Sequence, residues 1–572
     1  MITLTIDGHK VQVEPGTTIL QAAKKLGINI PTLCYHEDQD IHGVCRVCCV
    51  EVEGSRTFQA ACSYPVSEGM VVRTNTPAVR EARKVNVQLI LAHHPQDCLQ
   101  CARNLSCELQ SLAESMGVRE VPFARELKPY PKDDRNPAIV RDPEKCISCR
   151  RCVYACHEVQ RVGVIFPAER GYSATVGTFF GKSLDEVACT FCGQCILACP
   201  VGALTEKDDT DNVWDAINDP TKHVVIQTAP AVRVSLGEEL GMRPGSIVTG
   251  KMVAGLRRLG FDAVFDTDFT ADLTIMEEGH ELIQRVTKGG VLPMITSCSP
   301  GWINYIEHYY PNLLPHLSTC KSPQQMFGSL AKTYYAEKSG VDAKDMVVVS
   351  LMPCTAKKYE ATRPEMRSSG YQDVDYVLTT RELGRMFRES GIDLVSLGEE
   401  EYDAPMGIST GAAAIFGATG GVMEAALRTA YEVITGDELP SIDLEEVRGL
   451  EGVKESTVSV GDLKVKVAVA HTLANAEKVL EQIAAGKADY HFIEIMCCPG
   501  GCIGGGGQSI PTTMAIRAER INAIYDVDKS MELRKSHDNP AIKTIYKEFL
   551  GEPLGHRSHE LLHTHYTRKD RY

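Results

Sequence analysis

The arrangement of cysteines constrains this chain more than any other feature of its sequence. Twenty-two cysteines occur among 572 residues, and most of them fall in short, closely spaced runs. A signal peptide has a positively charged region followed by an apolar region, and the N-terminal segment MITLTIDGHK has neither in that order. We therefore expect a cytoplasmic protein whose thiols stay reduced. Clustered thiols in that compartment favour metal binding or redox chemistry, and soft thiolate ligands suit iron–sulfur clusters.

Composition narrows the possible partners. The formal net charge is −15, which argues against nucleic acid as a partner. The sequence has no run of about 18 apolar residues, so we expect no membrane span. A chain of this length should hold several domains.

The first 78 residues predict a small β-grasp domain. Residues 2–13 alternate between apolar and polar around Asp7-Gly8, which indicates a hairpin, and Thr17 or Thr18 can cap a helix that runs to Lys25. Four cysteines follow with the spacing C-x10-C-x2-C-x13-C, and they suit a 2Fe-2S cluster better than a zinc ribbon. They are Cys34, Cys45, Cys48 and Cys62.

A second ligand set lies in residues 79–118. Residues 79–112 look helical and carry the pattern H-x3-C-x2-C-x5-C, formed by His94, Cys98, Cys101 and Cys107. One histidine and three cysteines fit zinc as well as a 4Fe-4S cluster. The neighbouring cluster sites favour the 4Fe-4S cluster, and the spacing favours His94 over His93 as the ligand. A connector rich in proline and charge follows from about residue 119.

Residues 137–208 contain an internal repeat of C-x2-C-x2-C-x3-C. This is the pattern of bacterial two-cluster ferredoxins, in which the fourth cysteine of each run serves the other cluster. We therefore expect one 4Fe-4S cluster on Cys146, Cys149, Cys152 and Cys199. We expect a second on Cys189, Cys192, Cys195 and Cys156.

The remaining residues, 209–572, read as a large α/β domain. Five short apolar runs suggest strands: HVVIQTA, DAVFDT, VLPMITS, MVVVSLM and HFIEIM. Three of these runs lead into cysteines, at Cys298, Cys354 and Cys497-Cys498. Sites in open α/β sheets gather beyond the carboxyl ends of strands, so we expect one buried site fed by three loops. The predicted fold has several domains, with α+β domains in the N-terminal part of the chain and one large α/β domain in the C-terminal part.

Three motifs in this last region carry a family resemblance. They are TSCSPGW at 296–302, MPCTAKKYE at 352–360 and EIMCCPGGCIGGGGQ at 494–508. Together with the front end they resemble the FeFe hydrogenases of clostridial type, in the long form with four accessory clusters. The resemblance covers essentially the whole chain. It implies reversible reduction of protons to dihydrogen at an H cluster, a 4Fe-4S cube joined to a two-iron unit with carbonyl, cyanide and dithiolate ligands.

The resemblance also implies residue roles. Cys354, Cys498 and Cys502 match ligands of the cube, and Cys502 matches the ligand that bridges to the two-iron unit. Cys298 matches the cysteine that carries the last proton, and Lys357 matches a lysine that hydrogen-bonds a cyanide. Other positions match the pocket around the cluster: Ala229, Pro230, Pro323, Gln324, Met352, Phe416 and Met496. Gly504 to Gly507 are expected to let the backbone approach the cluster.

A proton relay is implied behind Cys298. Its members are Glu278, Glu281, Ser318 and Arg285. Glu278 and Glu281 are three residues apart, so they share a helix face. Because Glu277 is adjacent, the alternative is a solvated acidic face with no role in proton transfer.

One position departs from the family. The family motif has a second cysteine where this chain has Ser299, and that cysteine is the fourth ligand of the cube. Serine could ligate through oxygen, although it is a harder donor than thiolate. The cube could instead keep three cysteines and another small ligand, or Cys497 could compensate. We favour the interpretation that serine or a solvent-like ligand occupies the fourth position of the cube.

The resemblance also implies electron partners and maturation proteins. It implies ferredoxin or flavodoxin as the default carrier, while the CPGGC loop resembles catalytic subunits of NAD(P)-linked bifurcating hydrogenases, which work with flavin and iron–sulfur subunits. It further implies maturation proteins that supply the two-iron unit. The competing functions are an NADH dehydrogenase iron–sulfur subunit and a non-catalytic iron–sulfur assembly relative. His559-Glu560-x-x-His563 fits a zinc-protease pattern, but we expect it to be a helix that packs on the core.

Overall fold

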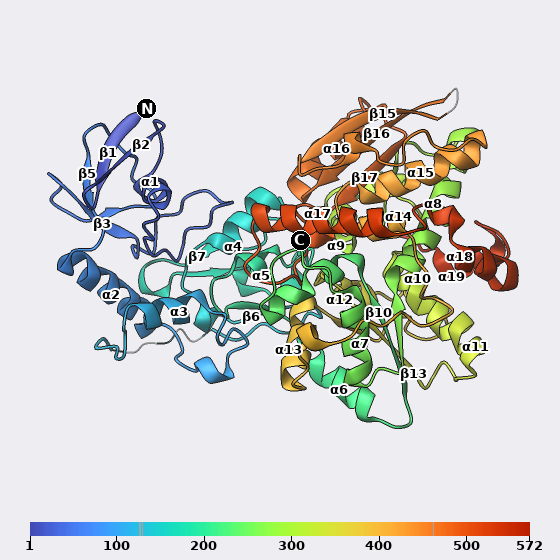
Figure 1. The fold of residues 1–572 in the computed structure, drawn as a ribbon, viewed down its shortest axis with the longest axis horizontal. Helices are drawn as coiled ribbons and strands as arrows, with labels where there is room; N and C mark the ends of the chain where they lie inside the picture. Colours follow the sequence, from blue (N-terminus) through green and yellow to red (C-terminus); the bar gives the residue numbers. More distant parts are fainter. Residues whose placement is uncertain (125–126, 128–129, 461–462, 572) are drawn as a thin grey trace.

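The structure is a computed structural model that describes residues 1–124, 127, 130–460 and 463–571. The chain runs from an N-terminal sheet at one end of the molecule, through the cysteine-rich segments, to two four-stranded C-terminal sheets at the other end (Figure 1). Residues 125–126 and 128–129, which belong to the predicted connector, lie outside the described residues.

The N-terminal part has the predicted hairpin and helix. Asp7 and Gly8 both have positive φ angles, of 47° and 86°, and join β1 (Ile2–Ile6) to β2 (His9–Val13). Thr18 caps α1 (Ile19–Lys25) in a capping box with Gln21. The strands form a five-stranded sheet in the order β2-β1-β5-β3-β4, completed by β3 (Cys49–Val52), β4 (Gln59–Ala60) and β5 (Val71–Arg73). Its core is a separate cluster of apolar side chains.

The second part is less continuous than the sequence suggests. Helix α2 (Pro77–Ala92) ends before the ligand motif, and α3 (Glu108–Ser115) begins after it. Residues 93–107 between them form a loop with one short 3-10 turn, so the expectation that 79–112 is helical is wrong for this loop. Pro95 has no backbone N–H to donate, which favours a break at this point.

The repeated cysteine runs fold as a pair of short helical segments between small antiparallel ladders. The helical segments are α4 (Arg151–Tyr154), which continues as a π-helical turn, and α5 (Gln194–Ala198). One ladder joins β6 (Ile139–Arg141) to β9 (Leu204–Glu206), and the other joins β7 (Phe166–Ala168) to β8 (Thr175–Gly177). Apolar side chains of this part share a cluster with Trp302, Tyr305 and Ile495, so it is packed directly on the C-terminal region.

All five predicted apolar runs form strands, but they are divided between two sheets. The first sheet is entirely parallel and has the order β11-β10-β13-β14. The second has the order β12-β17-β16-β15 and is parallel except for its β15–β16 edge. The strands are β10 (His223–Thr228), β11 (Ala263–Asp266), β12 (Met294–Ile295), β13 (Met346–Leu351), β14 (Tyr376–Leu378), β15 (Val453–Val460), β16 (Leu463–His471) and β17 (Phe492–Met496).

Helices cover and connect these sheets. The helices of this region are α6 (Thr210–Asn218), α7 (Thr249–Leu259), α8 (Thr267–Lys288), α9 (Pro300–Tyr309), α10 (Pro323–Leu330), α11 (Ala336–Ser339), α12 (Ala356–Ala361), α13 (Thr380–Glu389), α14 (Gly411–Ala414), α15 (Gly421–Thr435), α16 (Leu473–Ala484), α17 (Met514–Ser530), α18 (Pro540–Ile545) and α19 (His556–Leu562). In the view of Figure 1, the long helix α17 runs below β15, β16 and β17 and above β10 and β13.

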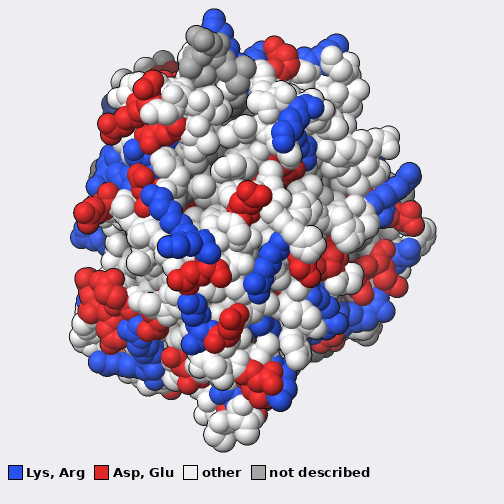
Figure 2. Space-filling model, turned by 90° about the vertical axis from the view of Figure 1, so that its right-hand side faces the viewer, with Lys and Arg blue, Asp and Glu red and all other residues white. Residues whose placement is uncertain are grey.

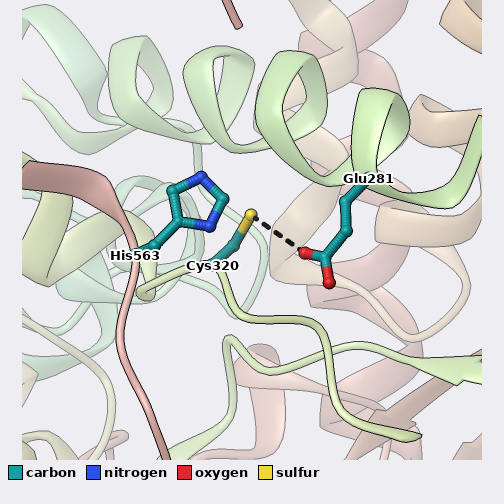
Figure 3. Close-up of side chains that lie close together, drawn as sticks. All are labelled: Glu281, Cys320 and His563. Carbon is teal, nitrogen blue, oxygen red and sulfur yellow. Dashed lines mark hydrogen bonds between the residues drawn. The ribbon is translucent and has the colours of Figure 1, made fainter. Parts of the chain in front are cut away.

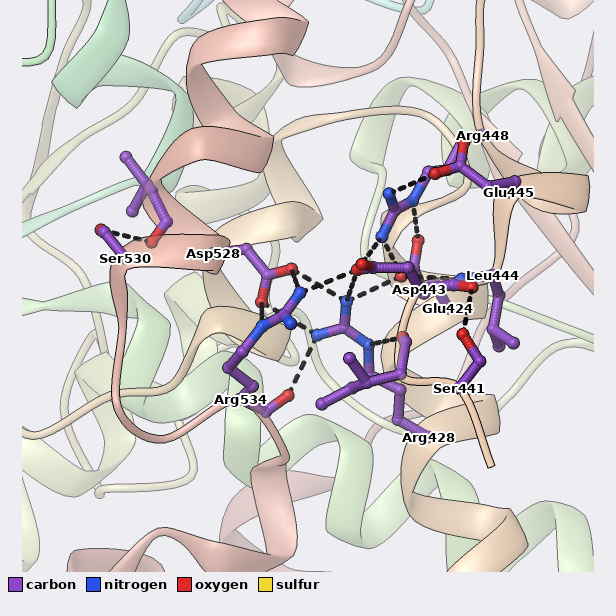
Figure 4. A network of polar contacts seen from close by, with 12 residues as sticks. Glu424, Arg428, Ser441, Asp443, Leu444, Glu445, Arg448, Asp528, Ser530 and Arg534 are labelled. Atoms are coloured by element: carbon purple, nitrogen blue, oxygen red, sulfur yellow. Dashed lines mark hydrogen bonds and ion pairs between the residues drawn. The ribbon is translucent and has the colours of Figure 1, made fainter. Parts of the chain in front are cut away.

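A buried ion-pair network fastens the C-terminal helices to α15. Arg428 is completely buried and lies 2.7 Å from Glu424 and 2.9 Å from Asp528, so it joins α15 to α17 (Figure 4). Arg448 and Arg534 extend the network with bonds to Glu424 and Asp528. Because buried charges are costly unless paired, removal of one partner would destabilise the contact between the helices.

No helix of the described residues is long and apolar enough to cross a membrane. Acidic and basic side chains are interspersed over the end of the molecule that carries the two C-terminal sheets (Figure 2). The net charge of −15 is therefore not gathered into one acidic patch on this face.

Candidate active site and cluster sites

A cavity lies where loops from the two C-terminal sheets meet. Its wall includes the residues that follow β10, β12, β13 and β17. The cavity wall contains each residue that the sequence placed at the main site: Ala229, Pro230, Cys298, Ser299, Pro323, Gln324, Met352, Cys354, Lys357, Phe416, Met496, Cys498 and Cys502. The expected single site fed by three cysteine loops is therefore present.

The donor set of the cavity fits an iron–sulfur cluster. Burial, followed by the neighbouring thiols Cys498 and Cys502, raises the pKa of Cys354, and burial raises the pKa of Cys502 to about 12. Empty of metal, these thiols would stay protonated; bound iron stabilises the thiolate form instead. The Gln324 Oε1 atom is buried in this wall without a hydrogen-bond partner, which also indicates a polar occupant.

Ser299 and Cys497 lie side by side in the wall. The Ser299 Oγ atom accepts a hydrogen bond of 3.2 Å from the Cys497 backbone N–H. The thiol of Cys497 contacts the sulfur atoms of Cys192 and Cys498, and it lies 3.9 Å from Gln160 Oε1. Cys497 thus sits between a cysteine of the ferredoxin-like part and a cysteine of the main cavity.

The glycine run after Cys502 lies in close contact with the backbone of neighbouring loops. A Cβ atom at Gly505 would lie 2.0 Å from the Pro353 carbonyl oxygen, and one at Gly506 would lie 2.4 Å from the Cys192 carbonyl oxygen. Gly504 and Gly507 likewise meet backbone atoms of Pro499 and Cys354. These glycines therefore let three loops pack backbone to backbone. Gly505 also lines the cavity, and the approach of this backbone to a cluster stays a prediction.

Lys357 is held at the cavity by two acceptors. Its Nζ atom lies 2.9 Å from Glu360 Oε2 and 3.1 Å from the Cys298 carbonyl oxygen. The Glu360 carboxylate also accepts bonds from Ser322 and Gln324. An ammonium group has three donors, so one remains for an anionic group in the cavity.

The residues of the predicted relay form a buried chain on α8 and the loop before α10. Glu277, Glu278 and Glu281 are 0%, 2% and 6% exposed, so the alternative of a solvated acidic face is wrong. The Ser318 hydroxyl is 3.2 Å from Glu281 Oε2 and also hydrogen-bonds Glu278. Arg285 Nη2 lies 2.6 Å from Glu281 Oε1 at the outer end of the chain.

Protonation states along this chain suit proton transfer. Burial raises the pKa of Glu278 to about 8, so its carboxyl group is largely protonated at neutral pH. Burial, and next the Glu278 carboxylate, raise the pKa of the Cys298 thiol well above its ordinary value. Both groups therefore hold a proton that they can pass on toward the cavity.

The cysteines of the ferredoxin-like part meet in the predicted exchanged sets. Cys146, Cys149, Cys152 and Cys199 line one cavity together, although Cys199 belongs to the second run. Cys156 lies close to the first three cysteines of the second run, so these four thiols form the second expected set. Cys192 of this second set also lines the main cavity.

His94 has the environment of a metal ligand. It is 8% exposed, burial lowers its pKa to about 4, and its Nδ1 atom has no hydrogen-bond partner. A neutral imidazole with a free nitrogen can bind iron or zinc. Cys101 of the same set lies close to Gly202, where a Cβ atom would be only 2.6 Å from its sulfur.

The four cysteines of the N-terminal sheet converge on its loops. Cys45 donates a hydrogen bond to Cys34 and lowers its pKa to about 6, and Cys62 does the same for Cys48, to about 7. The carbonyl oxygen of Leu33, next to Cys34, accepts a bond of 3.3 Å from Arg151. This contact joins the cysteine site of the N-terminal sheet to the ferredoxin-like part, and Cys192 of the ferredoxin-like part lines the main cavity.

Some wall residues were missed by the sequence analysis. Thr267 and Ala271 come from the first turns of α8, and Gly301 comes from α9. Nothing local marks them, because helix faces point at a cavity only once the sheets are packed. Cys192 could have been found from its place in the second ferredoxin run.

Comparison with protein families assigns each part of the chain. The profile described as "Iron only hydrogenase large subunit, C-terminal domain" matches residues 222–506, and "Iron hydrogenase small subunit" matches 514–569. A 2Fe-2S iron–sulfur cluster binding domain matches residues 1–77. The NADH-ubiquinone oxidoreductase-G iron–sulfur binding region matches 83–122, and the ferredoxin-like domain of NADH-quinone oxidoreductase subunit 3 matches 136–205.

Two similar proteins span the full length of this chain, and a third matches about two thirds of it. The NADP-reducing hydrogenase subunit HndD of Solidesulfovibrio fructosivorans is 51% identical over the full length of both chains. Iron hydrogenase 1 of Clostridium pasteurianum is 42% identical over 99% of this chain and 100% of its own. The solved structure of a HydA1 [FeFe]-hydrogenase variant from Chlamydomonas reinhardtii is 46% identical, covers 64% of this chain and 100% of its own, and superposes with a TM-score of 0.58.

Proposed function

The chain belongs to the iron-only (FeFe) hydrogenases, and from that premise we propose which of its residues hold the clusters and move the protons. It is an oxidoreductase that carries 2Fe-2S and 4Fe-4S domains in front of an H-cluster domain. Its reaction is the reversible reduction of protons to dihydrogen. We divide it into residues 1–78, 79–118, 137–208 and 209–572, a division supported by the separate small sheets of the front parts.

We assign the H cluster to the main cavity, with Cys354, Cys498 and Cys502 as thiolate ligands of the cube and Cys502 as the bridging ligand. The observation that carries this assignment is the convergence of three cysteines from two sheets in one apolar cavity. When bound, the cluster supplies the electrons and the iron site at which protons are reduced. Lys357 orients an anionic ligand with its free donor, and Met352 and Met496 exclude water from the wall.

The protein's own part in the reaction is the supply of protons. Cys298 gives its thiol proton toward the cavity, and Glu278 then protonates the resulting thiolate. Glu278 is recharged through the Ser318 hydroxyl from Glu281, which receives a proton beside Arg285. The hydrogen bonds between Ser318 and the two carboxyl groups support this order. Positioned acids of this kind commonly contribute about 10²–10⁴ to a rate.

We assign the fourth corner of the cube to Ser299. Its Oγ atom lines the cavity and accepts a backbone N–H bond, as a ligand atom at that corner would. The Cys497 thiol contacts two sulfur atoms that we assign as ligands, Cys192 and Cys498, and acts as a hydrogen-bond donor between them.

Metal content tests the assignment as a whole. Chain produced together with the maturation proteins should contain about 20 iron atoms, the sum expected for one 2Fe-2S cluster, three accessory 4Fe-4S clusters and an H cluster. It should also evolve hydrogen from a reduced dye. Chain produced without maturation should keep its cubes and lack the infrared bands of carbonyl and cyanide. Metal analysis that finds mainly zinc would refute the assignment.

We propose that electrons pass between the accessory clusters and NADP-linked flavin and iron–sulfur subunits, with ferredoxin or flavodoxin as the alternative carrier. The CPGGC loop and the full-length likeness to the NADP-reducing subunit support this. Leu99 and Leu105, in the loop of the His94 site, are 90% and 87% exposed and offer an apolar docking surface beside a cluster.

Purification of the chain from its native source would distinguish between these two kinds of electron carrier. If the chain copurifies with flavin-containing subunits, hydrogen should reduce NADP⁺ in the complex, and the isolated chain should not. Replacement of Leu99 and Leu105 by serine should weaken that complex without loss of dye-dependent activity. A native chain that purifies alone and exchanges electrons rapidly with ferredoxin would contradict the NADP-linked proposal.

A further inference from the structure

The histidines of the His559-Glu560-x-x-His563 sequence are not arranged as a metal-binding pair. Helix α19 ends at Leu562, so His563 lies just beyond it, while His559 is exposed on the helix. The two imidazole rings stack face to face, 4.4 Å apart and 8° from parallel. Stacked rings direct their nitrogen atoms sideways and not toward a shared ion. The function proposed above makes no use of this motif.

His563 is instead hydrogen-bonded to the proton relay. Its Nδ1 atom lies 2.8 Å from Thr319 Oγ1, and Thr319 Oγ1 lies 3.0 Å from Glu281 Oε2. Its Nε2 atom lies 3.1 Å from Glu277 Oε2 on the other side. The Glu281 and His563 side chains approach each other from α8 and the C-terminal segment, with Cys320 between them (Figure 3).

The partner on the far side, Glu277, is an anion. It accepts hydrogen bonds from the hydroxyl groups of Tyr546 and Ser558 and, at 2.9 Å, from the Leu554 N–H. Burial alone would raise the pKa of Glu277, but the bonds from His563, Ser558 and Tyr546 outweigh it and hold the pKa below its ordinary value. His563 must therefore donate from Nε2 to this carboxylate.

Thr319 then couples His563 to Glu281, because a hydroxyl group has only one proton to donate. If Thr319 donates to Glu281, His563 must donate from Nδ1 and is an imidazolium. If Thr319 donates to His563, Glu281 must carry the proton on Oε2. Arg285 lies 2.6 Å from Glu281 Oε1 and Ser318 is 3.2 Å from Oε2, which favours the first arrangement at rest.

We propose that His563 is a buried proton store that exchanges one proton with Glu281 across the Thr319 hydroxyl. In this step the His563 Nδ1–H bond breaks and a Thr319 O–H bond forms, while the original Thr319 proton moves to Glu281 Oε2. No electron moves and no further reactant is needed. The store lets Glu281 be recharged after it passes a proton inward, before one arrives from solvent. The proposal rests on the relay role proposed above for Glu281.

Metal binding at the same residues is disfavoured. The possible ligand atoms of Glu281, Cys320 and His563 lie within 4.8 Å of one another. However, both oxygens of Glu281 and both ring nitrogens of His563 already take part in hydrogen bonds. A cation would have to break these bonds, whereas proton exchange uses them.

The pH response of the store depends on every charged group that faces His563. Glu277 and Glu281 approach it from α8, and Arg285 stands behind Glu281. His559 stacks on it from its own helix, and Tyr546 and Cys320 approach from the segments packed alongside.

Two variants remove the exchange in different ways. Thr319→Val deletes the bridging hydroxyl and keeps the shape, and His563→Gln keeps side-chain hydrogen bonding but cannot become charged. We expect each to slow dye-driven hydrogen evolution roughly tenfold, less than the loss of a residue in the direct relay. Each should also remove one titration from the pH profile of the rate. Thr319→Ser, which restores the hydroxyl, should recover both rate and profile.

A second measurement does not depend on turnover. In pH-difference infrared spectra of chain made without maturation proteins, a carboxyl band that Glu281→Gln removes should titrate together with a histidine ring band. The two bands should titrate separately in Thr319→Val. Melting temperatures check that both variants are folded. The proposal is overturned if folded Thr319→Val keeps the wild-type pH profile, whereas failure of the relay itself would appear as full activity in Glu281→Gln.

Discussion

Replacing Cys298 by alanine is expected to reduce hydrogen evolution and uptake by about 10²–10⁴-fold, the usual contribution of a positioned proton-transfer group. The thiol lines the cavity, and its raised pKa keeps it protonated next to the Glu278 carboxyl. No other residue of the proposed relay is in the cavity wall, so the chain Glu281, Ser318 and Glu278 would end short of the cluster. Rates with a reduced dye and with hydrogen should both fall.

The iron content distinguishes a proton carrier from a ligand. Cys298→Ala should keep its iron and its carbonyl and cyanide infrared bands, because the assigned ligands are untouched. Cys49→Ala is a matched control, since it removes a buried thiol of the N-terminal sheet that does not line the cavity. It should retain the wild-type rate. Loss of iron from the Cys298 variant would mean that residues 298 and 299 have exchanged roles.

The largest effect on cluster content is expected at Ser299. Ser299→Ala removes the proposed oxygen ligand and leaves the cube with three thiolates, so we expect partial loss of the H cluster and of its infrared bands. Ser299→Cys should restore full occupancy. Because thiolate is a softer donor than alkoxide, it should also raise the reduction potential of the cube, which a redox titration followed by electron paramagnetic resonance would measure.

Cys497→Ala provides the matched comparison. It removes a thiol that contacts Cys192 and Cys498, so it should shift potentials while leaving the cube in place. If Cys497 is the fourth ligand, the order of the two alanine variants reverses, and Cys497→Ala loses the cluster while Ser299→Ala is mild. If neither variant loses iron, the corner is held by water or another small ligand, and the assignment to Ser299 is wrong.

Much of the candidate site could be predicted because its ligands are local in sequence. Cys146, Cys149 and Cys152 are close enough along the chain to share a cluster whatever surrounds them. Cysteines that follow apolar strands, such as Cys354 after β13, were expected at one edge because parallel strands end together. The capping of α1 by Thr18 and the Asp7-Gly8 turn were likewise predictable, since both depend on neighbours within a few residues.

Other features depended on contacts that no local pattern encodes. The five apolar runs looked alike, yet the structure divides them between two sheets, because pairing is chosen by side chains distant in sequence. Glu277 looked like part of an exposed acidic face, but α18 and α19 cover it. The glycines after Cys502 face other loops for the same reason.

By itself, the sequence determined the kind of chemistry: cysteine spacings specify iron–sulfur ligation, and the three loop motifs specify the family. The tertiary structure decided how the buried polar groups are connected. His563 reaches Glu281 through Thr319 only because the C-terminal segment packs against α8, more than 240 residues away in sequence. Ligand sets are fixed by short-range spacing, whereas hydrogen-bond chains between distant segments exist only after the core has excluded water and brought them together.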